Sequence, residues 1–336
     1  MLLAAGTGTS QASPTADEAA GGVPTVSISI KLLQLPVSAS SDPRAHEYII
    51  DHLAPGTVIH RQFQVADVGA TGIQMSVYAA AASISGGTFH FAPGDTQDEM
   101  TTWVSVSRPV LRLKPHQRVT EVATIAVPPA ATRGDQYGVI WAQVAAAAGP
   151  ESIKLISRVG IRIYLSVGPG GAPPADFAVG IPAATRVDGR PELSIPVRNT
   201  GGLAVDIIGT LSLSGGPGGL RAGPYRASTV VTLAPGQSGT VRYTPAAGLP
   251  DGPWHALVTL QSGLIVRTGQ FTVDFAGHVS AASGFPAALT AGLSAAAAVL
   301  LVTGLWLYLR RRRRRGGHGP GSQGHGARPP VTSLTG

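Results

Sequence analysis

Short runs in which apolar and polar residues alternate dominate the chain up to about residue 275. Residues 26–32 and 159–167 keep this period of two without interruption. Such a period places alternate side chains on opposite faces of a β-strand, with one face in a core and the other in solvent. Similar runs occur at residues 59–65, 73–79, 88–91, 103–106, 110–113, 119–127 and 137–146. Roughly nine strands without a helical period predict a β-sandwich at residues 26–167.

A second sandwich is predicted after a segment rich in glycine and proline, GPGGAPPA at residues 168–175. That composition is typical of a linker, so few contacts between the two domains and separate stability of each are expected. Alternation then resumes, as in Leu193, Ile195 and Val197, and defines a second domain at residues 176–275. The predicted fold class is mainly β, with two tandem immunoglobulin-like β-sandwiches followed by one C-terminal transmembrane helix.

The two predicted domains repeat three blocks in the same order. Residues 63–72 (FQVADVGATG) match 195–204 (IPVRNTGGLA), and residues 110–117 (VLRLKPHQ) match 230–237 (VVTLAPGQ). In the third pair, RGDQYGVIWAQV and LPDGPWHALVTL, an aromatic residue follows a Gly/Asp turn at the start of a late strand. Such a tyrosine often fixes a corner of a sandwich through its hydroxyl, so Tyr137 is predicted to be a structural corner residue.

The transmembrane helix is predicted near the end of the chain. Residues 287–309 carry no charge, and as a helix they would extend about 34 Å, against a hydrocarbon core of about 30 Å. The arginines that follow would hold a disordered tail, residues 310–336, on the cytoplasmic side. These membrane-flanking residues are Arg310, Arg311, Arg312, Arg313, Arg314 and Arg315. The sandwiches and a short stalk at residues 276–286 are therefore expected to be extracellular.

The first 25 residues are predicted to be a remnant signal peptide and a flexible leader. Residues 1–5 (MLLAA) are apolar but follow no basic residue, and Ser10, Gln11 and Ala12 match a small-residue cleavage site. The interpretation is that the true translation start lies upstream of Met1.

Charge and cysteine content exclude other classes. The seven charged residues beyond Leu309 are all arginines. Up to Leu309 the 18 Lys and Arg balance the 18 Asp and Glu, so the tail accounts for the net charge of +7. A basic block beside a membrane span, without interleaved aromatic residues, does not indicate a nucleic-acid partner. The chain has no cysteine, so burial alone must hold its domains together.

The sequence indicates neither an enzyme nor a cofactor. It contains no Gly-x-Ser-x-Gly elbow, P-loop or dinucleotide fingerprint. One alternative stays open, in which His46, His52 and His60 serve an exported metal-binding or hydrolytic protein. Their spacing differs from that of helical zinc sites, so no metal site is predicted.

Aromatic side chains supply the remaining candidate ligand-binding residues. Tyr48 and Trp103 are candidates for stacking on sugar rings, although a position in the core is favoured for Trp103. Trp141 lies in the middle of a strong strand and is expected in the core, whereas Phe89 and Phe91 could also offer flat faces.

Three blocks of the first domain resemble the extracellular domain of the WxL-interacting protein family, in the version seen in actinobacterial membrane proteins. They are residues 42–69 (DPRAHEYIIDHLAPGTVIHRQFQVADVG), 76–107 (SVYAAAASISGGTFHFAPGDTQDEMTTWVSVS) and 133–144 (RGDQYGVIWAQV). The resemblance implies a cell-surface protein with a basic tail and a first domain associated with peptidoglycan binding. Asp67 stands in a turn that is often Asn in that family.

These observations together predict a non-catalytic, single-pass protein of the cell membrane. Its expected partners are the membrane and either peptidoglycan or a cell-surface protein.

Overall fold

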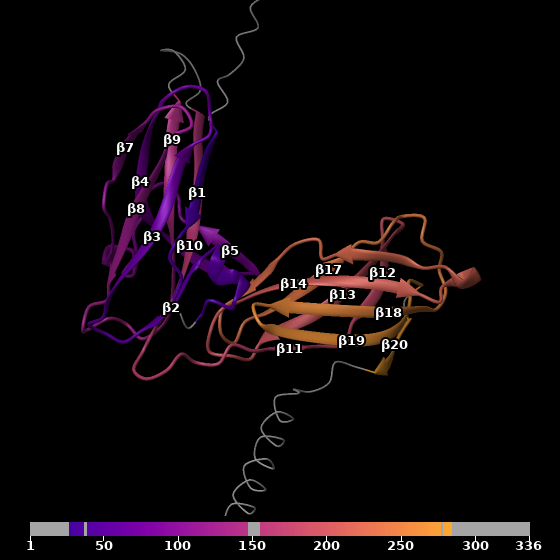
Figure 1. Ribbon diagram of the computed structural model, residues 1–336. Coiled ribbons are helices and arrows are strands. Elements are labelled where there is room, and N and C mark those ends of the chain that lie inside the picture. The colour runs from indigo at the N-terminus through magenta and orange to yellow at the C-terminus, as the bar shows by residue number, and fades with distance from the viewer. Residues whose placement is uncertain (1–26, 37–38, 147–154, 277, 284–336) are drawn as a thin grey trace, which may run out of the picture. The chain divides into compact units, whose positions relative to one another are not determined.

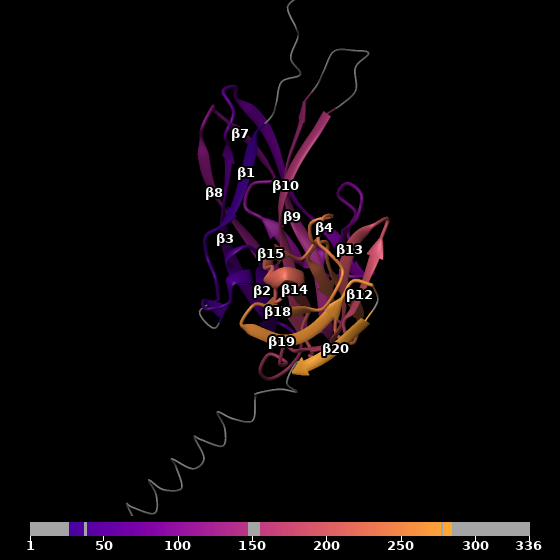
Figure 2. The ribbon, with the colours of Figure 1, turned by 90° about the vertical axis from the view of Figure 1, so that its right-hand side faces the viewer.

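A computed structural model describes residues 27–36, 39–146, 155–276 and 278–283, and these lie in one compact unit, residues 1–285. The fold is mainly β and contains two β-sandwiches, as the alternation predicts (Figures 1 and 2). The helical elements in this part of the chain include three short 3-10 turns. They are η2 (Pro43–His46), η3 (Thr101–Trp103) and η4 (Pro217–Gly219).

The first sandwich consists of a four-stranded and a six-stranded sheet. The four-stranded sheet has the order β1 (Ile28–Leu32), β3 (Val58–Asp67), β8 (Arg118–Ala126) and β6 (Val104–Val106). The six-stranded sheet has the order β2 (Ile49–Leu53), β10 (Leu155–Val167), β9 (Gly134–Ala146), β4 (Ile73–Ser85) and β5 (Thr88–Phe91), with β7 (Val110–Leu113) also paired to β4. The first two strands go to different sheets, since β1 pairs antiparallel with β3 and β2 pairs parallel with β10. This division is an immunoglobulin-like feature.

The second sandwich repeats the two-sheet plan. One sheet contains β11 (Phe177–Val179), β12 (Ala183–Val187), β13 (Arg190–Asn199) and β17 (Ser238–Tyr243). The other contains β14 (Val205–Ser214), β15 (Ala222–Arg226), β16 (Val231–Leu233), β18 (Trp254–Ser262), β19 (Ile265–Asp274) and β20 (His278–Ser283).

Each sandwich has its own core, built from the inward half of its alternating residues. Phe63, Met75 and Ile163 are fully buried in the first core, and Tyr243 and Trp254 in the second. Burying a side chain such as Phe63, Met75 or Ile163 contributes about 1.5–3 kcal/mol.

The internal repeat is confirmed by matching hydrogen bonds in the turns. The backbone N of Asp67 donates to Gln117 O (3.0 Å), and that of Asn199 donates to Gln237 O (2.9 Å). The side-chain Oε1 of Gln117 accepts from the backbone N of Lys114 (2.8 Å), as that of Gln237 does from Ala234 (3.2 Å). The residue matches read from the sequence therefore hold in three dimensions.

Two expectations about connections differ from the structure. Residues 168–175 connect the two sandwiches, but the contacts between the domains are more than a linker predicts: Thr232 N donates to Gly87 O (2.9 Å) and Gln237 Nε2 to Ile84 O (3.0 Å). The predicted stalk is also shorter than expected, because β20 pairs antiparallel with β19. Composition alone does not reveal which side chains meet beyond a linker.

The predicted membrane segment, its six flanking arginines and the leader at residues 1–25 lie outside the described residues. Within the described residues, no helix is long and apolar enough to cross a membrane.

Candidate binding face of the first sandwich

The outer face of the six-stranded sheet, which points away from the first core, carries aromatic and arginine side chains in rows. Residues opposite each other on neighbouring strands project from the same face. The first row is His52, Ser166 and Asp135. The following rows are Ile50, Tyr164 and Tyr137; then Arg162, Val139 and Ala80; then Gly160, Trp141 and Tyr78; and finally Arg158, Gln143 and Ser76. We call this surface the outer face.

Ring contacts run along the outer face. The centroids of neighbouring rings are 5.6 Å apart for Tyr48 and Tyr164, 5.3 Å for Tyr164 and Phe89, 5.2 Å for Phe89 and Phe91, and 4.9 Å for Phe91 and Trp141. Tilted and edge contacts of this kind each add about 0.5–1.5 kcal/mol beyond burial. The aromatic rings therefore form a continuous, mutually supported strip.

Two arginines lie against these rings. The guanidinium carbon of Arg162 is 4.8 Å from the Phe89 ring centroid, and that of Arg158 is 4.4 Å from the Trp141 ring centroid. Gly160 leaves room for the indole, since a Cβ at that position would lie 2.7 Å from Cε3 of Trp141. Cation–π attraction at such sites contributes about 0.5–2 kcal/mol, so both arginines are held against the rings.

The second sandwich covers one end of the outer face through Asp206. Oδ1 of Asp206 accepts hydrogen bonds from the hydroxyls of Tyr164 (2.9 Å) and Thr232 (2.7 Å). The carboxylate also lies 3.5 Å from Nη1 of Arg44 and 3.7 Å from Nη1 of Arg162. A carboxylate that is 6% exposed loses its water, and these four partners replace the water. The junction between the sandwiches is thus a buried ionic contact.

Asp135 makes a second junction contact. Its Oδ2 accepts from the backbone N of Ala204 in the second sandwich (2.9 Å) and from the Tyr137 hydroxyl (3.2 Å), and Arg44 donates to Ala204 O (3.0 Å). Burial raises the pKa of the Asp135 carboxyl above its usual value. Burial and the neighbouring Asp135 charge raise the pKa of Tyr137, so its hydroxyl stays protonated and serves as a donor.

The opposite end of the outer face is open and contains a groove of about 770 Å³. Its lining includes Tyr78, Gln143, Arg158 and Ile156 from the sheet, and Asp95 from the loop after β5. The Tyr78 hydroxyl donates to Oε1 of Gln143 (2.6 Å), which fixes the amide and leaves its N–H groups available. The groove presents a ring, an amide, a carboxylate and a guanidinium together.

The sequence-predicted ligand residues lie in different places. Tyr48 is half-buried on the outer face. Trp103 is 8% exposed and packs in the first core, so its ring is not available for stacking on a sugar. Tyr137 lies at the start of β9, as expected for a corner, but its hydroxyl donates to a side chain two residues earlier. Trp141 is buried on the outer face, outside the main core.

The three histidines do not converge. His52 belongs to β2 in one sheet and His60 to β3 in the other, while Nε2 of His46 contacts Ser40 O (3.1 Å). No group of three potential metal ligands exists among the described residues. The structure therefore does not bring the three histidines together into one site.

Sequence reasoning missed the groove residues Tyr78, Gln143 and Arg158. Their signal was their parity, since all three occupy outward positions in strands whose inward positions are apolar. Which outward residues meet across the sheet depends on the register, and one sequence does not provide that register.

No family model matches the chain, and no curated protein matches it. Solved structures similar to it include the YadV chaperone (12% identity, TM-score 0.37, 77% of this chain and 98% of that chain). Others are the Salmonella enterica SafA pilin in complex with the SafB chaperone (12%, 0.38, 74% and 97%) and the E. coli chaperone DraB (11%, 0.36, 74% and 98%).

These comparisons correct the resemblance to the WxL-interacting protein family. No model of that family matches the chain, and the similar structures are fimbrial chaperones instead. Individual strand and turn blocks such as residues 133–144 are shared by many β-sandwiches, which explains why the resemblance misled.

Proposed function

We propose that this chain is a non-catalytic binding protein of the cell surface, anchored in the membrane by residues 287–309. In this proposal the groove at the open end of the outer face binds peptidoglycan. The observation that carries it is the convergence of Tyr78, Gln143, Arg158 and Asp95 in one groove. Ligand-binding sites typically combine an aromatic surface with a small number of precisely placed polar groups.

The groove chemistry suits a glycan that carries peptide stems. A sugar ring offers C–H faces that can lie on the Tyr78 ring, and hydroxyls that can bond to the Gln143 amide and the Asp95 carboxylate. The stem peptides of peptidoglycan end in carboxylates. The Arg158 guanidinium can bind such a group in a charge-assisted, bidentate manner.

The proposed location rests on the C-terminal sequence. An uncharged run of sufficient length, followed at once by Arg310 to Arg315, is the pattern of a single span with a cytoplasmic tail. Tethering near the wall would raise the local concentration of the groove, so a weak single-site affinity would be sufficient for retention.

A co-sedimentation experiment tests the groove. Purified residues 1–285, the compact unit, are mixed with isolated peptidoglycan, beside the variants Arg158→Ala and Tyr78→Ala. We expect each variant to bind about tenfold more weakly, because a charge-assisted contact contributes about 1.5–3 kcal/mol. Arg198→Ala, an exposed arginine on β13, is the matched control and should bind as the wild type does.

Equal loss in the Arg198 control, or no sedimentation of the wild type, would contradict the proposal. If the wild type does not sediment and a photo-crosslinker at Ile156 labels one surface protein in cells, the groove binds a protein instead.

A further inference from the structure

A depression on the outer surface of the four-stranded sheet is lined by positive side chains. The register aligns Ser29, Ala66 and Arg118 in one row, and Lys31 with Gln64 in the next. Serine and alanine are short, so they form a floor between the long side chains of Lys31 and Arg118. The depression has a volume of about 440 Å³, and His116 lies at its edge.

The cations of this depression are unpaired. Lys31 and Arg118 have no ion-pair partner among the described residues. The two carboxylates nearby are not available, because Asp67 is 1% exposed and Glu121 is 0% exposed. Glu121 is moreover paired with Arg108. The exposed charged side chains of this surface are therefore positive.

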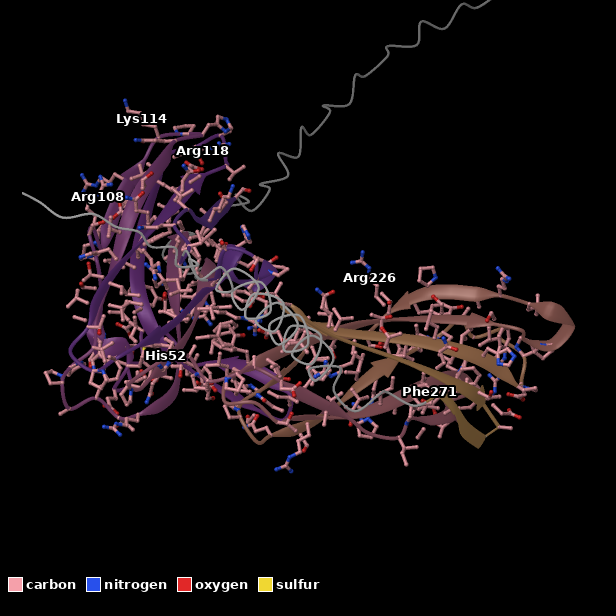
Figure 3. All side chains as sticks on the ribbon, turned by 60° about the horizontal axis from the view of Figure 1, so that its bottom comes forward. His52, Arg108, Lys114, Arg118, Arg226 and Phe271 are labelled. Carbon is pink, nitrogen blue, oxygen red and sulfur yellow. The ribbon has the colours of Figure 1, made fainter. Side chains whose placement is uncertain are left out.

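One more cation lies at the same end of the sandwich. Lys114 is exposed, and Figure 3 shows Lys114 and Arg118 at the end of the first sandwich that is far from His52. Together these side chains form a positive strip and not a single point. A chain with repeated negative charges fits such a strip better than one small anion does.

The second sandwich shows that the fold does not require these charges. In its matching turn, Ala234 stands at the position of Lys114, and Gly236 at that of His116. His116 has φ +61°, where Gly236 has φ +78°. A non-glycine residue in this region costs about 1–2 kcal/mol. The first sandwich therefore has a strained residue, His116, at the position where the second sandwich has the unstrained Gly236.

We propose that this depression binds an anionic polymer with repeated phosphodiester groups, such as a polyol phosphate chain of the cell wall. Arg118 supplies a fork that matches two phosphate oxygens, and Lys31 a mobile point charge. The Ser29 hydroxyl and the Gln64 amide donate to the remaining oxygens. Lys114 meets the next phosphate along the chain. This site is separate from the groove of the outer face and does not depend on it.

Titration of residues 1–285 with poly(glycerol phosphate) at several salt concentrations tests the proposal. Omitting residues 310–336 removes the arginine block, which would bind any polyanion. Binding through two to three cations should make log K fall with log salt at a slope of about −2. We expect the double variant Lys31→Gln/Arg118→Gln to lose at least tenfold in affinity and most of that slope. The matched control Arg198→Gln/Arg226→Gln in the second sandwich should retain both.

His116→Gly separates binding from folding. This variant adopts the residue of the repeat, so it should melt at the same or a higher temperature while binding the polymer several-fold more weakly. Unchanged affinity in Lys31→Gln/Arg118→Gln, or equal loss in the control pair, would overturn the proposal. Inorganic phosphate or phosphatidylglycerol vesicles that bind as tightly as the polymer would also overturn it, in favour of a single-anion or a lipid site.

Discussion

The turn after β3 in the first sandwich and the turn after β13 in the second share their backbone hydrogen bonds but differ at one side chain. In the second, Nδ2 of Asn199 donates to Leu203 O (2.8 Å) and Leu233 O (2.9 Å), and Oδ1 accepts from Gly201 N (3.0 Å). In the first, Oδ1 of Asp67 accepts from Gly69 N (2.8 Å), but Oδ2 is buried without a partner in the described part of the chain.

This difference shows what an amide provides that a carboxylate cannot. An asparagine both donates and accepts, whereas an ionised aspartate only accepts. A buried group without its partner costs about 1–3 kcal/mol or more. The two turns also differ in setting, because Ala204 of the second turn is docked on Asp135 and Arg44. The first turn lies beside the positive depression.

The largest expected effect comes from removing the docking contact. Asp206→Ala leaves the Arg44 and Arg162 guanidiniums without their buried carboxylate. We expect the free energy of unfolding to fall by about 3–5 kcal/mol, and a single calorimetric transition to split into two. Asp251→Ala is the control, since Asp251 is 57% exposed in its pair with Arg186 and should cost at most about 1 kcal/mol. Two transitions already in the wild type would show that the sandwiches unfold independently.

The next effect exchanges the two turn residues. Asp67→Asn restores a donor, and we expect the free energy of unfolding to rise by about 1–3 kcal/mol. Asn199→Asp removes both carbonyl contacts and should lower it by a similar amount. Urea unfolding followed by tryptophan fluorescence measures both variants. A loss of stability in Asp67→Asn would mean that the first turn does not accept the amide as the second does, and the comparison would fail.

The sequence predicted those parts of the fold that depend on local period. Residues 159–167 form a strand because their inward residues are apolar, and the sequence match between the blocks around Asp67 and Asn199 agrees with their shared backbone hydrogen bonds. Both features are written in neighbouring residues, so pattern is sufficient to find them.

The docking and the groove could not be predicted in this way. Arg44 and Asp206 are 162 residues apart. The glycines and prolines between the domains predict a mobile linker and give no sign of this contact. Trp141 and Tyr78 occupy outward positions in strands, and an aromatic residue in a strand has the same pattern whether it packs in a core or on an outer face. Tertiary pairing decides between the two.

The smallest effect concerns the corner residues, Tyr137 in the first sandwich and Trp254 in the second. Nε1 of Trp254 donates to Pro250 O within its own domain (3.1 Å), whereas the Tyr137 hydroxyl donates to Asp135, the acceptor that also holds Ala204. Tyr137→Phe should therefore lower the free energy of unfolding by about 1 kcal/mol and weaken the docking. The same loss in an Asp135→Ala background would show that the hydroxyl acts independently of that carboxylate.

The pH dependence of this corner follows from the raised pKa of Asp135. A carboxyl whose pKa is raised on folding favours the folded state most at low pH, and this contribution is lost as the pH rises from 3.8 through the folded pKa. Asp135→Asn keeps an oxygen acceptor for Ala204 N and Tyr137 but has no charge to bury. The stability of the variant relative to the wild type should therefore increase over that interval. Unfolding free energies measured at pH 3.5 and pH 7 for both proteins give this difference. A relative decrease would mean that the charged carboxylate stabilises the junction more than burial opposes it.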